Sequence, residues 1–209
     1  MNGDIRDRSL ATDVANRTVL SNGFRTLARY DVSYVDTAGD TRHQDRELLE
    51  GGRVVAAIGY DPKTLRLVLI RQYRLAAELA NQAGQMIEIV AGGKEEGETT
   101  LEAARREFVE ETTLEPAALR HVYTTMPTPG LTTEIAEVFI ALVDASALPE
   151  RAGEDDDEDI EPFTATIDEA LDAADRGAIV NSFTLLALNW FARRGEETVR
   201  AMLGDEASS

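Results

Sequence analysis

The sequence predicts an α+β protein in which a mixed β-sheet lies between helices and a small antiparallel β-sheet precedes it. Three observations support this fold class. Residues 24–34 alternate between apolar and polar side chains, as in a half-exposed strand. Residues 67–70 are all apolar, which is typical of a strand buried on both faces. Thr99 and Glu102 have the spacing of a capping box, which predicts a helix that starts near Thr100.

The N-terminal residues 1–50 are predicted to form a β-sheet region, and residues 51–209 the main domain. Residues 1–18 are polar and are expected to be only partly ordered. The strand at residues 24–34 is followed by a turn at residues 38–40 and by a second strand that runs through Arg46 to Leu49. A hairpin of this size is barely stable alone. It must therefore pack on the main domain or on a second subunit, and we expect the second subunit, in a homodimer.

The main domain is expected to contain five further strands, at residues 54–60, 65–73, 86–90, 120–125 and 135–143. Residues 76–85 are predicted to be a loop or a short helix. Two more helices close the chain. The first follows a second capping box at Thr166 and Glu169, and the second is capped by Asn181 or Ser182.

The composition excludes several classes of protein. The 209-residue chain has a formal net charge of −18, which opposes non-specific binding to nucleic acid or to anionic membranes. It has no cysteine, so disulfides, thiolate metal sites and cysteine nucleophiles are excluded. No apolar run approaches the ~20 residues that span a bilayer, and the N-terminus lacks an apolar core. A cytoplasmic location is expected.

The helix that starts near Thr100 is predicted to carry a metal site. Its buried stripe is expected to consist of Leu101, Ala104 and Phe108. Beside it, the helical period places three carboxylates on one strip of surface: Glu107, Glu110 and Glu111. Like charges at this spacing cost the helix about a few tenths of a kcal/mol each. Mg²⁺ or Mn²⁺, which prefer oxygen ligands, would remove that cost; the alternative is a solvated acidic surface.

This segment resembles the Nudix box. The matching positions are Gly92, Glu98, Arg106-Glu107-Phe108, Glu110-Glu111 and Leu114. The resemblance implies a Nudix α/β/α sandwich, metal ligation by Glu107, Glu110, Glu111 and the Ala91 carbonyl, and bracing of the carboxylates by Arg106. The one departure is Thr113, which replaces a glycine that usually ends the helix in a left-handed conformation. Threonine adopts that conformation reluctantly, so we expect a changed helix ending with the metal site retained.

Segments outside the box resemble ADP-ribose pyrophosphatases and their nucleoside-diphosphate-sugar relatives, including GDP-mannose hydrolases. These segments are residues 71–74, 88–92 and 128–130, with Thr133 and Glu134. Pro129 lies fifteen residues beyond Leu114, as the downstream proline of the ADP-ribose group does. GDP-mannose hydrolases share that proline, so it does not separate the two substrates.

Several residues are expected to bind the substrate. Arg71 and Arg74, at the end of a buried strand, are suited to hold phosphate oxygens through bidentate hydrogen bonds, unless they are ordinary surface arginines. Glu88 lies in an apolar run and needs a partner: a metal, a substrate hydroxyl, or a salt bridge with Arg71 or Arg74. The resemblance also implies that Glu134, near the turn at Pro129 and Gly130, meets the terminal ribose or the metals. We assign Arg46 to substrate binding as well.

The acidic run at residues 154–161 is expected to supply the carboxylate that positions the attacking water. In the related enzymes a carboxylate at this place precedes an isoleucine, and counting back from Ile160 gives Asp156, with Glu158 as its neighbour. The relatives usually have glutamate there, so Glu154 or Glu158 remain alternatives. By itself such a run would be a solvated loop.

The function that follows from the resemblance is Mg²⁺-dependent hydrolysis of the pyrophosphate bond of ADP-ribose or a related nucleoside diphosphate sugar. The products would be a nucleoside monophosphate and a sugar phosphate. Glu110, Glu111 and Arg106 would serve the chemistry together with the loop carboxylate. The alternatives are a GDP-mannose-preferring hydrolase, a nucleotide-sugar sensor with little turnover, and an enzyme for intact dinucleotides.

Overall fold

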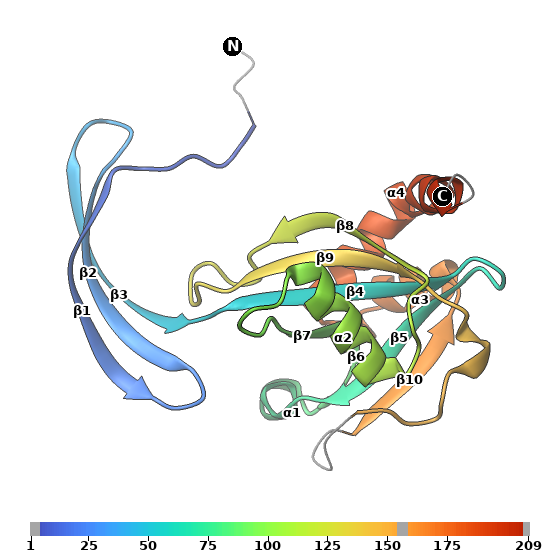
Figure 1. The fold of residues 1–209 in the computed structure, drawn as a ribbon. Coiled ribbons are helices and arrows are strands. Elements are labelled where there is room, and N and C mark those ends of the chain that lie inside the picture. The colour runs from blue at the N-terminus through green and yellow to red at the C-terminus, as the bar shows by residue number, and fades with distance from the viewer. Residues whose placement is uncertain (1–4, 154–158, 207–209) are drawn as a thin grey trace. The chain divides into compact units, whose positions relative to one another are not determined.

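The computed structural model describes residues 5–153 and 159–206 (Figure 1). These residues form two compact units. The first comprises the chain up to Gly52 together with Thr128–Glu134, and the second comprises Arg53–Pro127 with the residues from Ile135 onward. Within the described part of the chain, no helix combines the length and the apolar character that a membrane span requires.

The first unit is a three-stranded antiparallel sheet in the order β1–β2–β3. Its strands are β1 (Thr12–Asn22), β2 (Thr26–Val35) and β3 (Thr41–Glu50). The hairpin of β2 and β3 confirms the prediction. The expectation of partial order up to residue 18 was wrong from Thr12 on, because β1 pairs along its length with β2. Arg17 also donates to both carboxylate oxygens of Glu50, at 2.6 and 2.7 Å.

The second unit contains the predicted mixed sheet, in the order β10–β5–β4–β9–β8, with β6 paired to β5 and β7 paired to β4. Only β4 and β9 run parallel among these pairs of described strands. The strands are β4 (Arg53–Asp61), β5 (Arg66–Tyr73), β6 (Gln85–Glu88), β7 (Val90–Gly93), β8 (Ala118–Thr125), β9 (Ile135–Leu142) and β10 (Ile160–Ala165). As predicted from its apolar sequence, β5 lies inside the sheet. Strand β10 was not predicted.

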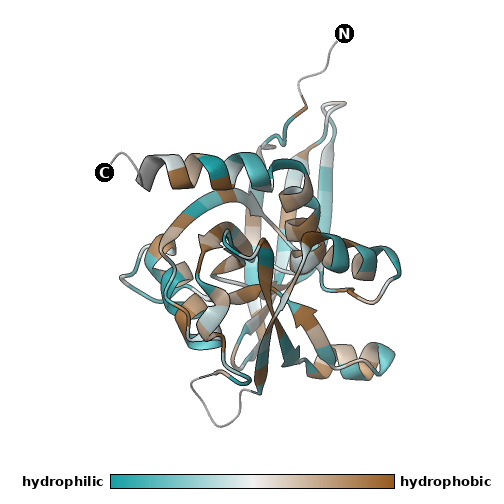
Figure 2. Cartoon of the chain, turned by 90° about the vertical axis from the view of Figure 1, so that its right-hand side faces the viewer, coloured by the Kyte–Doolittle hydropathy of each residue, from teal (hydrophilic) through white to brown (hydrophobic). Residues whose placement is uncertain are grey.

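Helices cover both faces of this sheet, which confirms the α/β/α arrangement (Figure 1). The helices of this unit are α1 (Leu75–Asn81), α2 (Thr100–Thr112), α3 (Ile167–Asp175) and α4 (Ser182–Glu206), with a 3-10 turn at Ala145–Ala147. Helices α2, α3 and α4 cover the sheet, whereas α1 has no buried residue. Helix α2 packs Phe108 against Val68 and Ile70 on one face. Helices α3 and α4 pack against Leu67 and Leu69 on the other. Apolar and polar residues alternate around α4 (Figure 2), as expected for a helix with one buried side.

Helix α2 begins as the sequence predicts. Thr99 accepts a hydrogen bond from the Glu102 N–H, while the Glu102 carboxylate accepts one from the Thr99 N–H, which completes the capping box. Ala104 and Phe108 are buried. The prediction that Leu101 is buried with them was wrong: Leu101 is 47% exposed, because it lies in the first turn and the buried residues of α2 begin only at Ala103.

The end of α2 corrects the expectation for Thr113. This residue adopts the left-handed conformation that glycine usually supplies, with φ 58°, and its N–H bonds to the Val109 carbonyl. The helix ending is therefore kept. Thr112 assists, because its hydroxyl donates to the Phe108 carbonyl at 2.5 Å and accepts from the Leu114 N–H at 3.2 Å.

Replacing Thr113 with Gly is expected to stabilise the protein. A left-handed non-glycine residue costs about 1–2 kcal/mol, and the Thr113 side chain is exposed, so little packing is lost. Part of this gain is offset, because glycine loses more conformational entropy on folding than threonine does. We expect a net gain of about 1 kcal/mol, or about 2–4 °C in Tm for a chain of this size. Thermal melting measures it, and a lower Tm than that of the wild type would contradict this account of the helix ending.

Candidate active site

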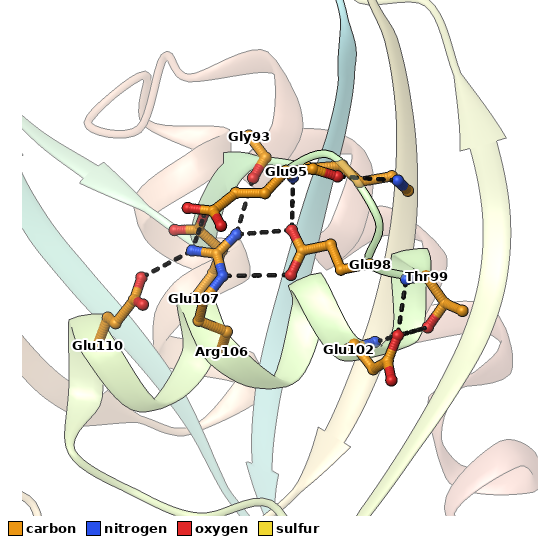
Figure 3. Close-up of polar contacts among 9 residues, drawn as sticks. Gly93, Glu95, Glu98, Thr99, Glu102, Arg106, Glu107 and Glu110 are labelled. Atoms are coloured by element: carbon orange, nitrogen blue, oxygen red, sulfur yellow. Dashed lines mark hydrogen bonds and ion pairs between the residues drawn. The ribbon is translucent and has the colours of Figure 1, made fainter.

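Arg106 is the centre of a network of carboxylates on α2 and the loop before it (Figure 3). Its Nη1 donates to Glu107 Oε1 at 2.9 Å and to Glu110 Oε2 at 3.0 Å. Its Nη2 donates to Glu98 Oε1 and to the Gly93 carbonyl, both at 2.9 Å. One guanidinium therefore holds the glycine loop and three carboxylates in fixed positions.

Glu98 is the strongest partner of Arg106. The Glu98 carboxylate accepts from Nη2 and, at 3.3 Å, from Nε of Arg106, and its Oε1 also accepts from the Glu95 N–H at 2.5 Å. These bonds lower the pKa of Glu98 and, with smaller contributions from Glu107 and Glu110, raise the pKa of Arg106. Sequence reasoning did not assign a role to Glu98, although its position in the Nudix box was the available signal.

Glu111 lies on the inner side of α2 and is only 5% exposed. Its Oε2 accepts a hydrogen bond from the Ala91 N–H of β7 at 3.2 Å. In a β-strand the N–H and C=O of one residue point to the same side, so the Ala91 carbonyl lies on the side of Glu111 and away from β4. The structure thus brings together a buried carboxylate and the carbonyl that were predicted to share a metal.

Gly92 makes room for the Glu107 carboxylate. A Cβ atom on Gly92 would lie 1.9 Å from Glu107 Cδ and within 2.1 Å of both carboxylate oxygens. Any Cβ here would displace the Glu107 carboxylate from this position. Gly93, the next residue, has no such neighbour, because a Cβ there would meet nothing within 4 Å.

The chemistry of these donors fits a hard divalent cation. Glu98, Glu107 and Glu110 present three carboxylates to a single guanidinium. Glu111, beside the backbone of Ala91, adds a fourth carboxylate that lies against β7. In the described part of the chain no three acidic or histidine side chains converge on one point as metal ligands. Arg106 occupies the position between Glu107 and Glu110 in this arrangement.

Arg74 and Glu88 form a bidentate salt bridge at the ends of β5 and β6. Arg74 Nε lies 3.1 and 3.2 Å from the two carboxylate oxygens, and Nη2 lies 2.7 Å from Oε2. The sequence left a metal, a substrate hydroxyl, Arg71 and Arg74 as possible partners of Glu88. The structure pairs Glu88 with Arg74. The Glu88 side chain is 5% exposed and that of Arg74 is 42% exposed, so the carboxylate is buried while the guanidinium reaches the surface.

Arg71 lies on a different side of the sheet. Its guanidinium stacks over the Phe163 ring, 4.4 Å from the centroid, and donates to Glu161 at 2.9 Å. Phe163 packs on the core beneath α3 and α4, which is the face opposite α2. The structure therefore does not bring Arg71 together with the carboxylates of α2.

The remaining site residues divide into two groups. Four lie in the first unit: Arg46, Pro129, Gly130 and Glu134. There Glu134 lies 3.8 Å from Arg25 Nη2, and Arg46 Nη1 donates to the carbonyl of Asp45 at 2.9 Å. Asp156 and Glu158, with the alternative Glu154, lie outside the described residues.

The short strand β7, with Gly92 and Gly93, leads into the capped helix α2, whose glutamates are held by Arg106 in an oxygen-rich cluster. Residues 51–183 match the NUDIX domain. The ADP-ribose pyrophosphatase of Escherichia coli (strain K12) is 31% identical over 180 residues, which cover 85% of this chain and 86% of that protein. The GDP-mannose pyrophosphatase of Escherichia coli O1:K1 / APEC is 33% identical over 175 residues, 82% and 90% of the two chains. The chain belongs to the Nudix family, whose members generally use divalent metal cations.

Proposed function

We propose that this protein hydrolyses the pyrophosphate bond of ADP-ribose or a related nucleoside diphosphate sugar, in a Mg²⁺-dependent reaction that gives a nucleoside monophosphate and a sugar phosphate. The observation that carries the proposal is the carboxylate network of α2 around Arg106, with Glu111 beside Ala91. The names of the relatives support this class of substrate.

Four groups would hold the cation: the carboxylates of Glu107, Glu110 and Glu111 and the carbonyl of Ala91. A bound divalent cation supplies positive charge against the diphosphate and makes water a better nucleophile at neutral pH. The negative charge of these residues and of the whole chain, −18, would otherwise repel an anionic substrate.

The protein's own residues would orient the reactants. Arg106 keeps Glu107 and Glu110 in place through its Nη1 bonds. Arg74 would bind a phosphate oxygen with the exposed part of its guanidinium, while Glu88 fixes its orientation. We assign orientation of the attacking water to Asp156 or Glu158, and contact with the sugar or base to Arg46, Pro129, Gly130 and Glu134. Arg71, on the opposite face, would contribute less than Arg74.

A panel of substrates tests the proposal. ADP-ribose, GDP-mannose, UDP-glucose and NADH are offered at equal concentration, with Mg²⁺ and with EDTA, and nucleoside monophosphate is measured. We expect Mg²⁺-dependent cleavage of a nucleoside diphosphate sugar. A preference for GDP-mannose would identify a GDP-mannose hydrolase, the alternative that the similarity to GDP-mannose pyrophosphatase supports. Tight binding without product would replace the hydrolase with a sensor, and preference for NADH would replace it with a dinucleotide hydrolase.

We also propose a homodimer formed through the first unit. Its sheet leaves apolar side chains exposed on β1 and at the end of β2: Val14, Val19, Leu20 and Val35. Such a surface is typical of an interface with another chain, and a second copy would cover it. Light scattering at micromolar concentration is expected to give the mass of two chains, and a mass of one chain would refute the dimer.

A further inference from the structure

The first turn of α4 fills a break between two strands of the site. Strand β6 ends at Glu88 and β7 begins at Val90, so Ile89 lies between them. Its N–H donates to the hydroxyl oxygen of Thr184 at 3.1 Å, and that hydroxyl lies 3.3 Å from the Ile87 carbonyl. Thr184 is fully buried. Since unpaired buried backbone groups are costly, Thr184 stabilises the break that separates Glu88 from Ala91.

Asn181 connects the start of α4 to Glu88. Its Oδ1 accepts from the Thr184 N–H at 3.1 Å, which caps the helix, and its carbonyl accepts from the Leu185 N–H. Its Nδ2 donates to Glu88 Oε1 at 3.1 Å. The same amide therefore fixes the helix start and one carboxylate oxygen, across 93 residues of sequence.

Glu88 transmits this constraint to Arg74. Oε1 accepts from Asn181 and from Arg74 Nε, and Oε2 accepts from Arg74 Nη2 at 2.7 Å. The Glu88 side chain is only 5% exposed, so its carboxylate needs such donors. With Asn181 in place its plane is fixed, and the planar guanidinium must align with it.

We propose that Asn181 is a positioning residue, which orients Arg74 through Glu88 for the phosphate oxygens of the substrate. This inference rests on the proposed function. Its prediction is specific, because Asn181 donates to the Glu88 carboxylate: a change at Asn181 is expected to affect substrate binding only while Glu88 is present.

Two variants separate the link to Glu88 from the helix cap. Asn181→Ser keeps an oxygen that can cap α4 but is too short to reach Glu88. Asn181→Asp keeps the cap and the shape but places a second carboxylate against Glu88. Loss of one hydrogen bond to a buried charge predicts a rise in KM of about tenfold for Asn181→Ser, and a larger rise for Asn181→Asp. The kcat is expected to stay within about threefold, because the contact of Arg74 with the phosphates would stabilise the bound substrate and the transition state equally.

Two controls accompany the variants, each with the panel substrate that the wild-type protein cleaves fastest. Asn189→Asp makes the same chemical change on the exposed side of α4, where the amide donates to the Leu185 carbonyl at 2.9 Å, and should leave KM unchanged. In a Glu88→Gln background, Asn181→Ser should add no further rise in KM. An additive effect, or an unchanged KM in both Asn181 variants, overturns the proposal.

A measurement without substrate separates this inference from the proposed function. Hydrogen exchange of the Arg74 Nε–H is followed by NMR and assigned by its loss in Arg74→Lys. In the wild type this proton is held by Glu88, and we expect exchange to be about tenfold faster in Asn181→Ser. Unchanged exchange overturns the proposal, whereas a wild-type protein that cleaves no substrate but shows the change in exchange refutes only the proposed function.

Discussion

Replacement of Glu111 by Gln is expected to lower turnover about a thousandfold while the protein still folds. A metal site contributes several kcal/mol of charge stabilisation, and about 4 kcal/mol corresponds to that factor. The amide of glutamine keeps an oxygen that can accept the Ala91 N–H, which Glu111 accepts at 3.2 Å. The charge is therefore removed without removing this contact with β7.

Steady-state kinetics and thermal melting of the same preparations measure this effect. Glu115→Gln is the matched control, because Glu115 lies just beyond α2, is 67% exposed in its side chain and pairs with Arg105. It should leave kcat unchanged. Unchanged kcat in a folded Glu111→Gln protein would remove Glu111 from the reaction.

Gly92→Ala is expected to lower kcat/KM about 100-fold. The added Cβ would occupy the position of the Glu107 carboxylate, 1.9 Å from its Cδ, and would drive that group away from Arg106. Displacement of a catalytic group by about 1 Å can cost this factor. The obstructed atoms are the end of a flexible side chain, so the free energy of unfolding should change little.

Gly93→Ala is the matched control, since its Cβ would meet nothing within 4 Å. It should keep the wild-type kcat/KM and gain slightly in Tm, because alanine restricts the unfolded chain. Equal activity of the two variants would show that the position of Glu107 against Gly92 is unimportant.

Local signals explain what the sequence predicted well. The two capping boxes, Thr99 with Glu102 and Thr166 with Glu169, join residues three apart, so their geometry needs no knowledge of the rest of the fold. The clustering of the α2 carboxylates likewise follows from the helical period. The interior position of β5 follows from its unbroken apolar run.

Elements that depend on distant partners were missed. All residues of β1 are exposed, so no face of it carries the alternation that reveals a strand. Strand β10 follows an acidic run and contains Pro162, yet it is held by its pairing with β5. The predicted single strand at residues 86–90 is two strands, because β6 pairs with β5 and β7 with β4. Between them the Ile89 N–H donates to Thr184, 95 residues away.

In the site too, local sequence predicted some features, whereas the choice of contact partner depends on residues far away in the chain. Glu88 was recognised as needing a partner because a charge lies in an apolar run, but the choice of Arg74 over Arg71 depends on which face each arginine occupies. Arg71 follows Ile70 in β5, so its side chain points to the face opposite α2, where it contacts Phe163 and Glu161. Thr113 was expected to change the end of α2, but the hydrogen bonds of Thr112 and the exposure of the Thr113 side chain accommodate it.

We propose that the carboxylates of α2 support metal-dependent cleavage between the two phosphates of a nucleoside diphosphate sugar. The most direct test is ³¹P NMR of ADP-ribose and, separately, GDP-mannose incubated with the protein in Mg²⁺ and in EDTA. In Mg²⁺ we expect the diphosphate resonances of at least one substrate to be replaced by two phosphomonoester resonances in equal amounts, and we expect EDTA to prevent this. Persistence of both diphosphates in Mg²⁺, or cleavage that EDTA does not stop, would contradict the proposal.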